Sequence, residues 1–129
     1  MINIVESDRG NLTAIDLTQL IFLPKRIFIV NNVSINEWRS DHAHRLDHQV
    51  LFCLNGRLKV ELTNKFHDII NKQLFFIEAG ETIDIPPLTW SRIQFIKYRS
   101  EFLCVCSESY DENEYIRNYN EFLEIINVQ

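Results

Sequence analysis

The segment QVLFCLNGRLKVEL (residues 49–62) decides the fold class of this chain. In its second half apolar and charged residues alternate, as in a strand with one buried face. Its first half is apolar on both faces, which is typical of a strand covered on two sides. Asn55-Gly56, between the halves, tolerates the positive φ angles of a type I′ turn. The sequence therefore predicts an antiparallel hairpin at this point.

Similar short runs, rich in β-branched and aromatic residues, continue outward from residue 10 to residue 106. Eight or nine such runs separated by turn residues predict an antiparallel sandwich or barrel. Beyond them, apolar residues recur at intervals of three and four between Tyr115 and Ile126. This spacing predicts one amphipathic helix on the barrel, with Asp111 as its N-cap and Glu114 as the reciprocal partner. No linker or repeat is visible, so we expect a single domain over residues 1–129.

The composition narrows the classes of function. Apolar residues make up 46% of the chain and aromatic residues 12%, which is a globular composition. A net charge of −5 without a Lys/Arg run argues against nucleic acid as a partner. No apolar run approaches the roughly 20 residues that span a membrane, and the first residues lack the apolar core of a signal peptide. We therefore expect no membrane contact and a cytoplasmic location.

Three cysteines, Cys53, Cys104 and Cys106, lie inside apolar strand-like runs. An odd number in this setting predicts buried free thiols rather than a disulfide framework. The spacing of the last two is not that of a CxxC motif, so we expect no zinc or redox role for them.

Three of the four histidines lie in DHAHRLDH (residues 41–48), and this cluster has three interpretations. Period two places His42 and His44 on one face of a strand, where two imidazoles could exchange protons near neutral pH. A metal-binding cupin would follow them with a carboxylate, whose place His48 or Gln49 takes, and with a later histidine, which is missing. Three histidines could still hold zinc or iron. The third interpretation is a polar strand end without chemistry.

Several stretches together resemble the cupin-fold sugar 3,4-ketoisomerases. The resemblance implies an all-β cupin, a jelly-roll barrel of the RmlC-like type with a short C-terminal helix, and a homodimer. The matching pieces occur in the order found in that family and span nearly the whole chain: RGNLTAID, PKRIF, RSDHAHR, HQVLFCLNG, the Pro-x-x-Trp of PPLTW, and the ending SYDENEYIRNYNEF.

The same resemblance implies an isomerase without metal or cofactor that acts on a dTDP-linked keto-deoxysugar, typically dTDP-4-keto-6-deoxyglucose. A base removes the proton beside the 4-ketone to give an enediol, and protonation of the neighbouring carbon leaves a ketone at position 3. His42 and His44 would supply the base and the acid, with His44 favoured as the base at C-3. The product would serve the biosynthesis of an amino-deoxysugar for surface glycans.

The resemblance also implies which side chains contact the substrate. Arginine forks suit the diphosphate and the developing oxyanion. The tryptophan matches one at the pocket mouth of relatives, although core packing would explain it equally well. The candidate substrate-binding residues are Arg9, Arg26, Arg39, Gln49, His48 and Trp90.

The chain departs from the family pattern in ways that leave its activity open. Relatives carry a tyrosine in the strand after Lys-Arg, where this chain has Phe28 and Ile29, and His48 could replace the lost hydroxyl. Ser40 stands in place of a glycine, and Ser91 in place of a histidine. Two alternatives therefore remain beside the isomerase, namely a non-catalytic sugar-nucleotide-binding cupin and a metal-dependent cupin enzyme.

Overall fold

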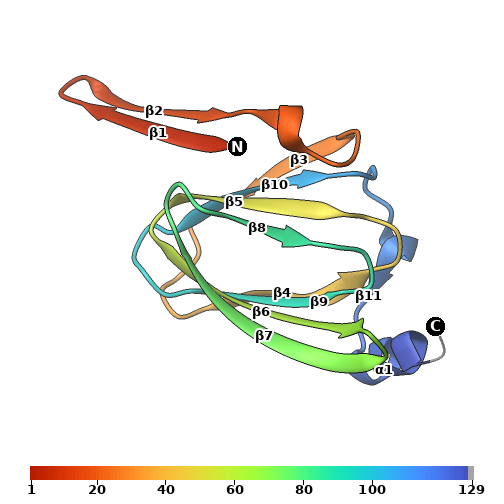
Figure 1. Ribbon diagram of the computed structural model, residues 1–129. Coiled ribbons are helices and arrows are strands. Elements are labelled where there is room, and N and C mark those ends of the chain that lie inside the picture. Colours follow the sequence, from red (N-terminus) through yellow and green to blue (C-terminus); the bar gives the residue numbers. More distant parts are fainter. Residues whose placement is uncertain (128–129) are drawn as a thin grey trace.

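The computed structural model describes residues 1–127, and antiparallel strands dominate it (Figure 1). Two 3-10 turns, Leu17–Gln19 and Glu112–Glu114, and one α-helix, α1 (Tyr119–Asn127), complete the described chain. The strands are β1 (Ile2–Ser7), β2 (Gly10–Ile15), β3 (Arg26–Val30), β4 (Trp38–His44), β5 (Gln49–Asn55), β6 (Arg57–Phe66), β7 (Ile69–Glu78), β8 (Thr82–Ile85), β9 (Trp90–Phe95), β10 (Glu101–Cys106) and β11 (Tyr115–Ile116).

Two antiparallel sheets lie face to face and enclose the main core (Figure 1). One has the strand order β3-β10-β5-β8, and the other has the order β11-β4-β9-β6-β7. Side chains from both sheets, including Leu51, Leu58 and Phe95, are almost fully buried between them. The predicted all-β barrel with a short C-terminal helix is confirmed. The three cysteines are buried free thiols, as predicted.

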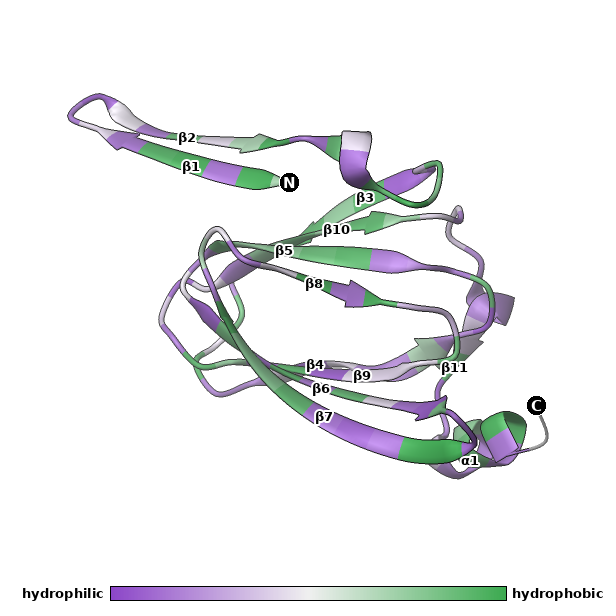
Figure 2. Ribbon diagram, in the orientation of Figure 1, coloured by the Kyte–Doolittle hydropathy of each residue, from purple (hydrophilic) through white to green (hydrophobic). Residues whose placement is uncertain are grey.

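Strand β5 is covered on both faces, which explains its continuous apolar sequence. Leu51 and Cys53 face the core between the sheets, whereas Val50 and Phe52 face a second cluster formed with the N-terminal segment. Figure 2 shows that β5 is hydrophobic over most of its length. The two-sided burial predicted from the sequence is therefore confirmed.

The hairpin predicted at Asn55-Gly56 is wrong. Strand β5 pairs with β10 and β8, so both of its edges are occupied, and β6 pairs with β7 and β9 in the other sheet. Asn55-Gly56 is instead the link by which the chain crosses between the sheets. Gly56 has a φ of 77°, and a Cβ at this position would lie 2.7 Å from Ser100 Cα. The glycine is needed for a close approach as well as for its backbone conformation.

Strands β1 and β2 form a hairpin that projects away from the barrel (Figure 1). Within the described chain, β1 and β2 pair only with each other. Its base packs on the outer face of β5 through Met1, Ile2 and Ile15. Farther out, Val5 and Leu12 are 51% and 61% exposed, so this hairpin presents apolar side chains to the surroundings.

The C-terminal segment contains a shorter helix than predicted. Asp111 caps only the 3-10 turn, by accepting the Asn113 backbone N–H, and the helix α1 is capped by Asn118, whose Oδ1 accepts the Glu121 N–H at 2.9 Å. The predicted reciprocal contact from Glu114 is wrong too, because its carboxylate accepts the backbone N–H groups of Leu46 and Asp47.

Between the turn and the helix, Tyr115 and Ile116 pair with β4 instead of continuing a helix. The helix itself buries Phe122 and Ile126 against a cluster that includes Ala43, so its predicted packing on the barrel is confirmed. Among residues 1–127, no helix has the length and apolar character needed to cross a membrane.

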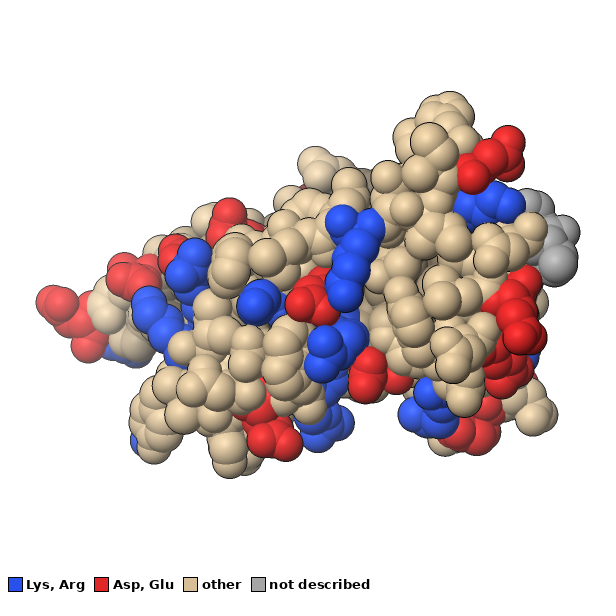
Figure 3. Space-filling view, turned by 90° about the horizontal axis from the view of Figure 1, so that it is seen from below, with Lys and Arg blue, Asp and Glu red and all other residues tan. Residues whose placement is uncertain are grey.

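The outer face of the five-stranded sheet is polar, and basic side chains form a row across it with acidic ones beside them (Figure 3). Arg92 stacks over Trp38 at 4.2 Å and pairs with Glu61 at 3.3 Å. Lys59 lies 5.7 Å from the centre of the same tryptophan ring. The charged positions of β6 therefore face outward, as its alternating pattern predicts.

Candidate active site

A pocket of about 270 Å³ lies between the two sheets. Strands β3 and β10 supply mainly apolar wall, whereas β4, β9 and the segment around β11 supply polar groups. The lining residues are Phe28, Val30, Arg39, Ser40, His42, Gln49, Leu51, Ile85, Ser91, Ile93, Phe102, Cys104, Tyr115 and Arg117.

The two histidines of β4 lie side by side at this pocket. The ring centroids of His42 and His44 are 4.8 Å apart, with the rings nearly perpendicular. His42 lines the pocket, whereas His44 is only 5% exposed and lies behind it. Tyr115 packs against both imidazoles, at 4.9 and 4.4 Å between centroids, because β11 pairs with β4. The shared face predicted from period two is confirmed.

A bulge in β4 orients His42. Ser40 and Asp41 have φ values of 76° and 61°, and the pairing with β9 shifts register between Ser40 and His42. The bulge lets His42 Nδ1 donate to the Ser40 carbonyl oxygen at 3.1 Å. A carbonyl can only accept, so the proton of the neutral ring lies on Nδ1 and the Nε2 lone pair is free.

The surroundings of His42 keep it neutral. Burial lowers the pKa of His42 to about 4, and repulsion from His44 and Arg117 contributes to this shift. Burial also lowers the pKa of His44, although Asp47 opposes that shift. At neutral pH both rings are therefore uncharged, and His42 can act as a base without first losing a proton.

Two exposed arginines border the pocket. Arg39 makes no ion pair with any other described residue, so its guanidinium is available to an anion. Arg117 lies over the Tyr115 ring at 4.3 Å and makes a two-point contact with Glu112 at 2.7 and 3.1 Å. The predicted place of Arg39 beside the histidines agrees with the structure, and Gln49 also lines the pocket.

Tyr115 and Arg117 are pocket residues that the sequence reasoning did not select. The helical spacing predicts Tyr115 in an amphipathic helix, and no local pattern indicates a role for Arg117. The available signal was the YDENEYIR segment, whose resemblance to the ketoisomerases is specific.

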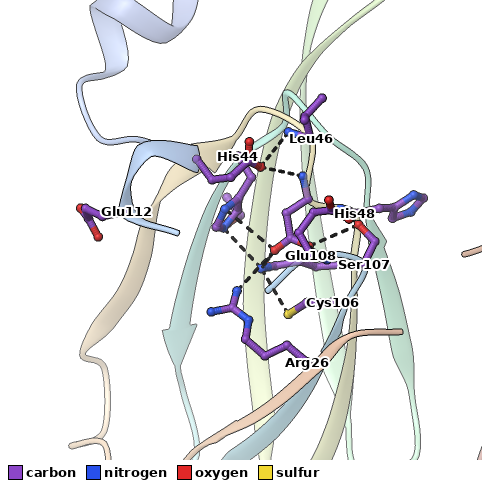
Figure 4. A network of polar contacts seen from close by, with 12 residues as sticks. Arg26, His44, Leu46, His48, Cys106, Ser107, Glu108 and Glu112 are labelled. Carbon is purple, nitrogen blue, oxygen red and sulfur yellow. Dashed lines mark hydrogen bonds and ion pairs between the residues drawn. The ribbon is translucent and has the colours of Figure 1, made fainter. Parts of the chain in front are cut away.

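Four of the six predicted substrate contacts, Trp90, His48, Arg9 and Arg26, do not line the pocket. Trp90 is 4% exposed and packs on Phe122, so it is a core residue, and its Nε1 donates to Asp41 at 3.1 Å. His48 points away from the paired histidines (Figure 4), and its ring contacts Asp84 at 2.6 Å. It therefore does not replace the missing tyrosine hydroxyl.

Arg9 lies in the turn of the β1–β2 hairpin, far from the pocket of its own chain (Figure 1). A fourth candidate, Arg26, does not line the pocket either. It pairs with buried Asp47 at 3.4 Å and stacks on Phe28 and Tyr110. Neither arginine is placed in this chain to hold a phosphate inside the pocket.

A protein metal site needs several donor side chains gathered in one place. Within residues 1–127, no three His, Cys, Asp or Glu side chains are grouped so that they could share a metal ion. The polar groups at the pocket include the imidazole of His42, the phenol of Tyr115 and the guanidinium groups of Arg39 and Arg117.

Two packed antiparallel sheets with a polar pocket between them define a cupin-type jelly-roll protein that carries a histidine pair. Residues 1–127 match the model of the FdtA family, described as WxcM-like, C-terminal. The TDP-4-oxo-6-deoxy-alpha-D-glucose-3,4-oxoisomerase of Aneurinibacillus thermoaerophilus is 31% identical over 119 residues, which are 92% of this chain and 84% of that enzyme. The chain belongs to this family of sugar 3,4-ketoisomerases.

Solved structures agree with this assignment. A variant of the 3,4-ketoisomerase QdtA from Thermoanaerobacterium thermosaccharolyticum, in which one histidine is replaced by asparagine, was solved with TDP-4-keto-6-deoxyglucose. It is 28% identical to this chain, with a TM-score of 0.83 over 99% of this chain and 91% of that one. The dTDP-4-dehydrorhamnose 3,5-epimerase of Bacillus anthracis, at 9% identity and a TM-score of 0.73 over 88% of this chain and 73% of that one, shares the fold.

Proposed function

We propose that this protein converts TDP-4-keto-6-deoxyglucose into a TDP-3-keto-6-deoxyhexose by proton transfer through an enediol. The observation that carries the proposal is a neutral imidazole, His42, in a pocket that is also lined by Arg39, whose guanidinium makes no ion pair within residues 1–127. The family assignment and the ligand named for the QdtA structure support this substrate.

The chemistry requires a base, stabilisation of an oxyanion and return of a proton. His42 Nε2 takes the proton from C-3 while the C–H electrons form the C3–C4 double bond and charge the C-4 oxygen. Protonation of that oxygen gives the enediol. Loss of the proton from the C-3 hydroxyl and delivery of one to C-4 then complete the exchange. Because His42 faces the pocket and His44 lies behind it, the geometry favours His42 as the base, which reverses the order expected from the resemblance.

Tyr115 supports the same proposal. Phe28 lines the pocket in the strand where the resemblance leads us to expect a tyrosine, while Tyr115 brings a phenol to the same pocket against both imidazoles. A phenol can donate a proton to the C-4 oxygen and accept it again. We propose that Tyr115 supplies the hydroxyl group for proton transfer that Phe28 and Ile29 lack.

Charged groups at the rim fit the diphosphate. Guanidinium forks match phosphate oxygens, and Arg39 and Arg117 border the same pocket. Arg39 has no competing carboxylate in the described chain, whereas Arg117 would have to share its charge with Glu112. We therefore assign the main phosphate contact to Arg39.

We further propose a homodimer that acts in the cytoplasm, on a route to an amino-deoxysugar of surface glycans. Exposed apolar residues on the N-terminal hairpin and on the outer face of the edge strand β3 support the dimer. Ile27 and Ile29 of β3 are 54% and 53% exposed. A 3-ketosugar product supports the route, because a ketone is the substrate that an aminotransferase needs.

The direct test is to incubate the purified protein with TDP-4-keto-6-deoxyglucose and a 3-aminotransferase, and to detect the 3-amino sugar. We expect His42→Asn to reduce kcat by about 10²-fold or more, with TDP affinity retained. The matched control is His67→Asn in the β6–β7 turn, which we expect to leave kcat within about twofold.

Two results would overturn the proposal. Calorimetry that shows TDP binding by the wild-type protein without turnover would identify a non-catalytic binding module. A stoichiometric metal that is retained on purification without chelator, and that is required for activity, would identify a metal-dependent cupin.

A further inference from the structure

A buried carboxylate lies behind the histidine pair, outside the pocket. Asp47 is 2% exposed and accepts contacts from four donors. The donor residues Arg26, Ser107 and Glu108 are labelled in Figure 4. Its Oδ1 accepts the Glu108 N–H at 3.0 Å and the Ser107 hydroxyl at 3.4 Å. Its Oδ2 accepts Gln49 Nε2 at 2.9 Å and Arg26 Nη2 at 3.4 Å. All four contacting atoms are donors, so the carboxylate acts only as an acceptor.

This carboxylate fixes the orientation of the Gln49 amide. Since Asp47 accepts, the end of Gln49 that faces it must be the NH₂ group. The second hydrogen of that NH₂ faces His44 Nε2 at 3.3 Å and the weaker acceptor Cys106 Sγ at 3.6 Å. An NH₂ group cannot accept a hydrogen bond, so His44 Nε2 carries the lone pair and the neutral ring keeps its proton on Nδ1.

The Nδ1 atom of His44 is itself distinctive. It is buried and has no hydrogen-bond partner among the described residues. The carboxylate oxygen that faces it is Asp47 Oδ2 at 4.0 Å, which is beyond hydrogen-bond distance but well within electrostatic range. Asp47 therefore acts on both nitrogens of His44, on Nε2 through Gln49 and on Nδ1 directly.

We propose that Asp47 is a positioning residue for the isomerisation, which holds His44 as the Nδ1–H tautomer through Gln49 and places a negative charge behind the imidazole pair. When His42 takes the proton from the substrate, the positive charge appears beside His44, and Asp47 supplies the counter-charge on the side away from the sugar. The kinetic part of this inference rests on the proposed function, whereas the tautomer is a property of the free protein.

Several other charged or titratable groups face His44, and their contributions oppose one another. Burial lowers the pKa of His44, with Arg26 and Arg117 acting in the same direction, whereas Asp47 and Glu114 raise it. Removing the Asp47 charge should therefore lower the pKa of His44 further. The remaining groups in contact with the ring are His42 and Tyr115, and Cys106 reaches it through Gln49.

The first test needs no variant. In ¹⁵N-labelled wild-type protein without ligand, long-range ¹H–¹⁵N spectra should show His44 with Nδ1 protonated and Nε2 unprotonated. A spectrum with the proton on Nε2 would overturn the inference. In Asp47→Asn, where Gln49 is free to turn, we expect the Nε2–H form to appear and the pKa of His44, followed by NMR titration, to fall.

The second test is kinetic. Asp47→Asn should lower kcat about tenfold or more while KM for the sugar nucleotide changes less than about twofold, since Asp47 does not line the pocket. The matched control is Asp84→Asn, which removes the carboxylate partner of the third histidine, His48, on the exposed side of the barrel.

The outcomes separate the two proposals. An unchanged His44 tautomer, pKa and kcat in Asp47→Asn would refute the positioning role even in an active enzyme. A wild-type protein that lacks isomerase activity but shows the expected tautomer would refute the proposed function alone.

Discussion

His42 combines a functional and an energetic effect in one side chain. The same burial that keeps its ring neutral for catalysis prevents the folded protein from taking up a proton that the unfolded chain accepts. The pKa of the ring is about 4 in the folded state, against 6.5 for an unperturbed histidine. Between these two values the unfolded state binds more protons, so folding stability must fall as the pH falls.

This effect predicts a loss of about 2 kcal/mol of unfolding free energy from His42 between about pH 7.5 and about pH 5. Urea unfolding at the two pH values measures it. In His42→Asn this part of the pH dependence should disappear, while the dependence from other groups, including His44, remains. Equal losses in the two proteins would show that the ring is not held neutral.

For single residues, the spacing in the local sequence predicted some side-chain positions correctly. The pairing of His42 with His44 followed from period two alone, because both lie in one strand. The place of Tyr115 could not be predicted in the same way, since it depends on pairing with β4 some seventy residues earlier. The core position of Trp90 was likewise undecided, because the helix that covers it lies in a distant part of the chain.

Among the elements, the link between β5 and β6 shows the limit of local turn chemistry. Asn55-Gly56 is a strong hairpin signal, but hairpin formation requires that β5 has a free edge, and β10 and β8 occupy both edges. The β6–β7 hairpin instead turns at His67-Asp68, where both residues have positive φ without any glycine. Strand existence was therefore predictable from local sequence, whereas strand partners were not.

Two of the three glycines with positive φ, Gly56 and Gly80, are expected to differ in the cost of substitution by alanine. In Gly80→Ala the nearest atom to the new Cβ is Ile4 Cδ1 at 3.8 Å, so only the backbone conformation is penalised, by about 1 kcal/mol. In Gly56→Ala the Cβ also overlaps the Ser100 side chain, and we expect at least about 2–3 kcal/mol. Urea unfolding of both variants compares them, and equal costs would mean that the contact with Ser100 relaxes freely.

For the whole molecule, the apolar surface near the N-terminus predicts the assembly state. Ile21 and Leu23, which precede β3, are 83% and 79% exposed. Sedimentation velocity should give twice the 15.4 kDa mass of the chain for the wild-type protein. The double variant Ile21→Asp with Leu23→Asp should give a monomer, whereas Ile35→Asp, in the loop before β4, should remain a dimer. A wild-type monomer at tens of micromolar would contradict the proposed homodimer.

The consecutive left-handed residues Ser40 and Asp41 restrict how this chain can evolve. Few residue types occupy such a conformation without strain, and glycine, asparagine and aspartate are among those that do. The orientation of the His42 ring depends on that bulge. The backbone conformation therefore limits which residues positions 40 and 41 tolerate, independently of any contact with the substrate. A β-branched residue at either position would therefore disturb the orientation of His42 without removing any group that performs chemistry itself.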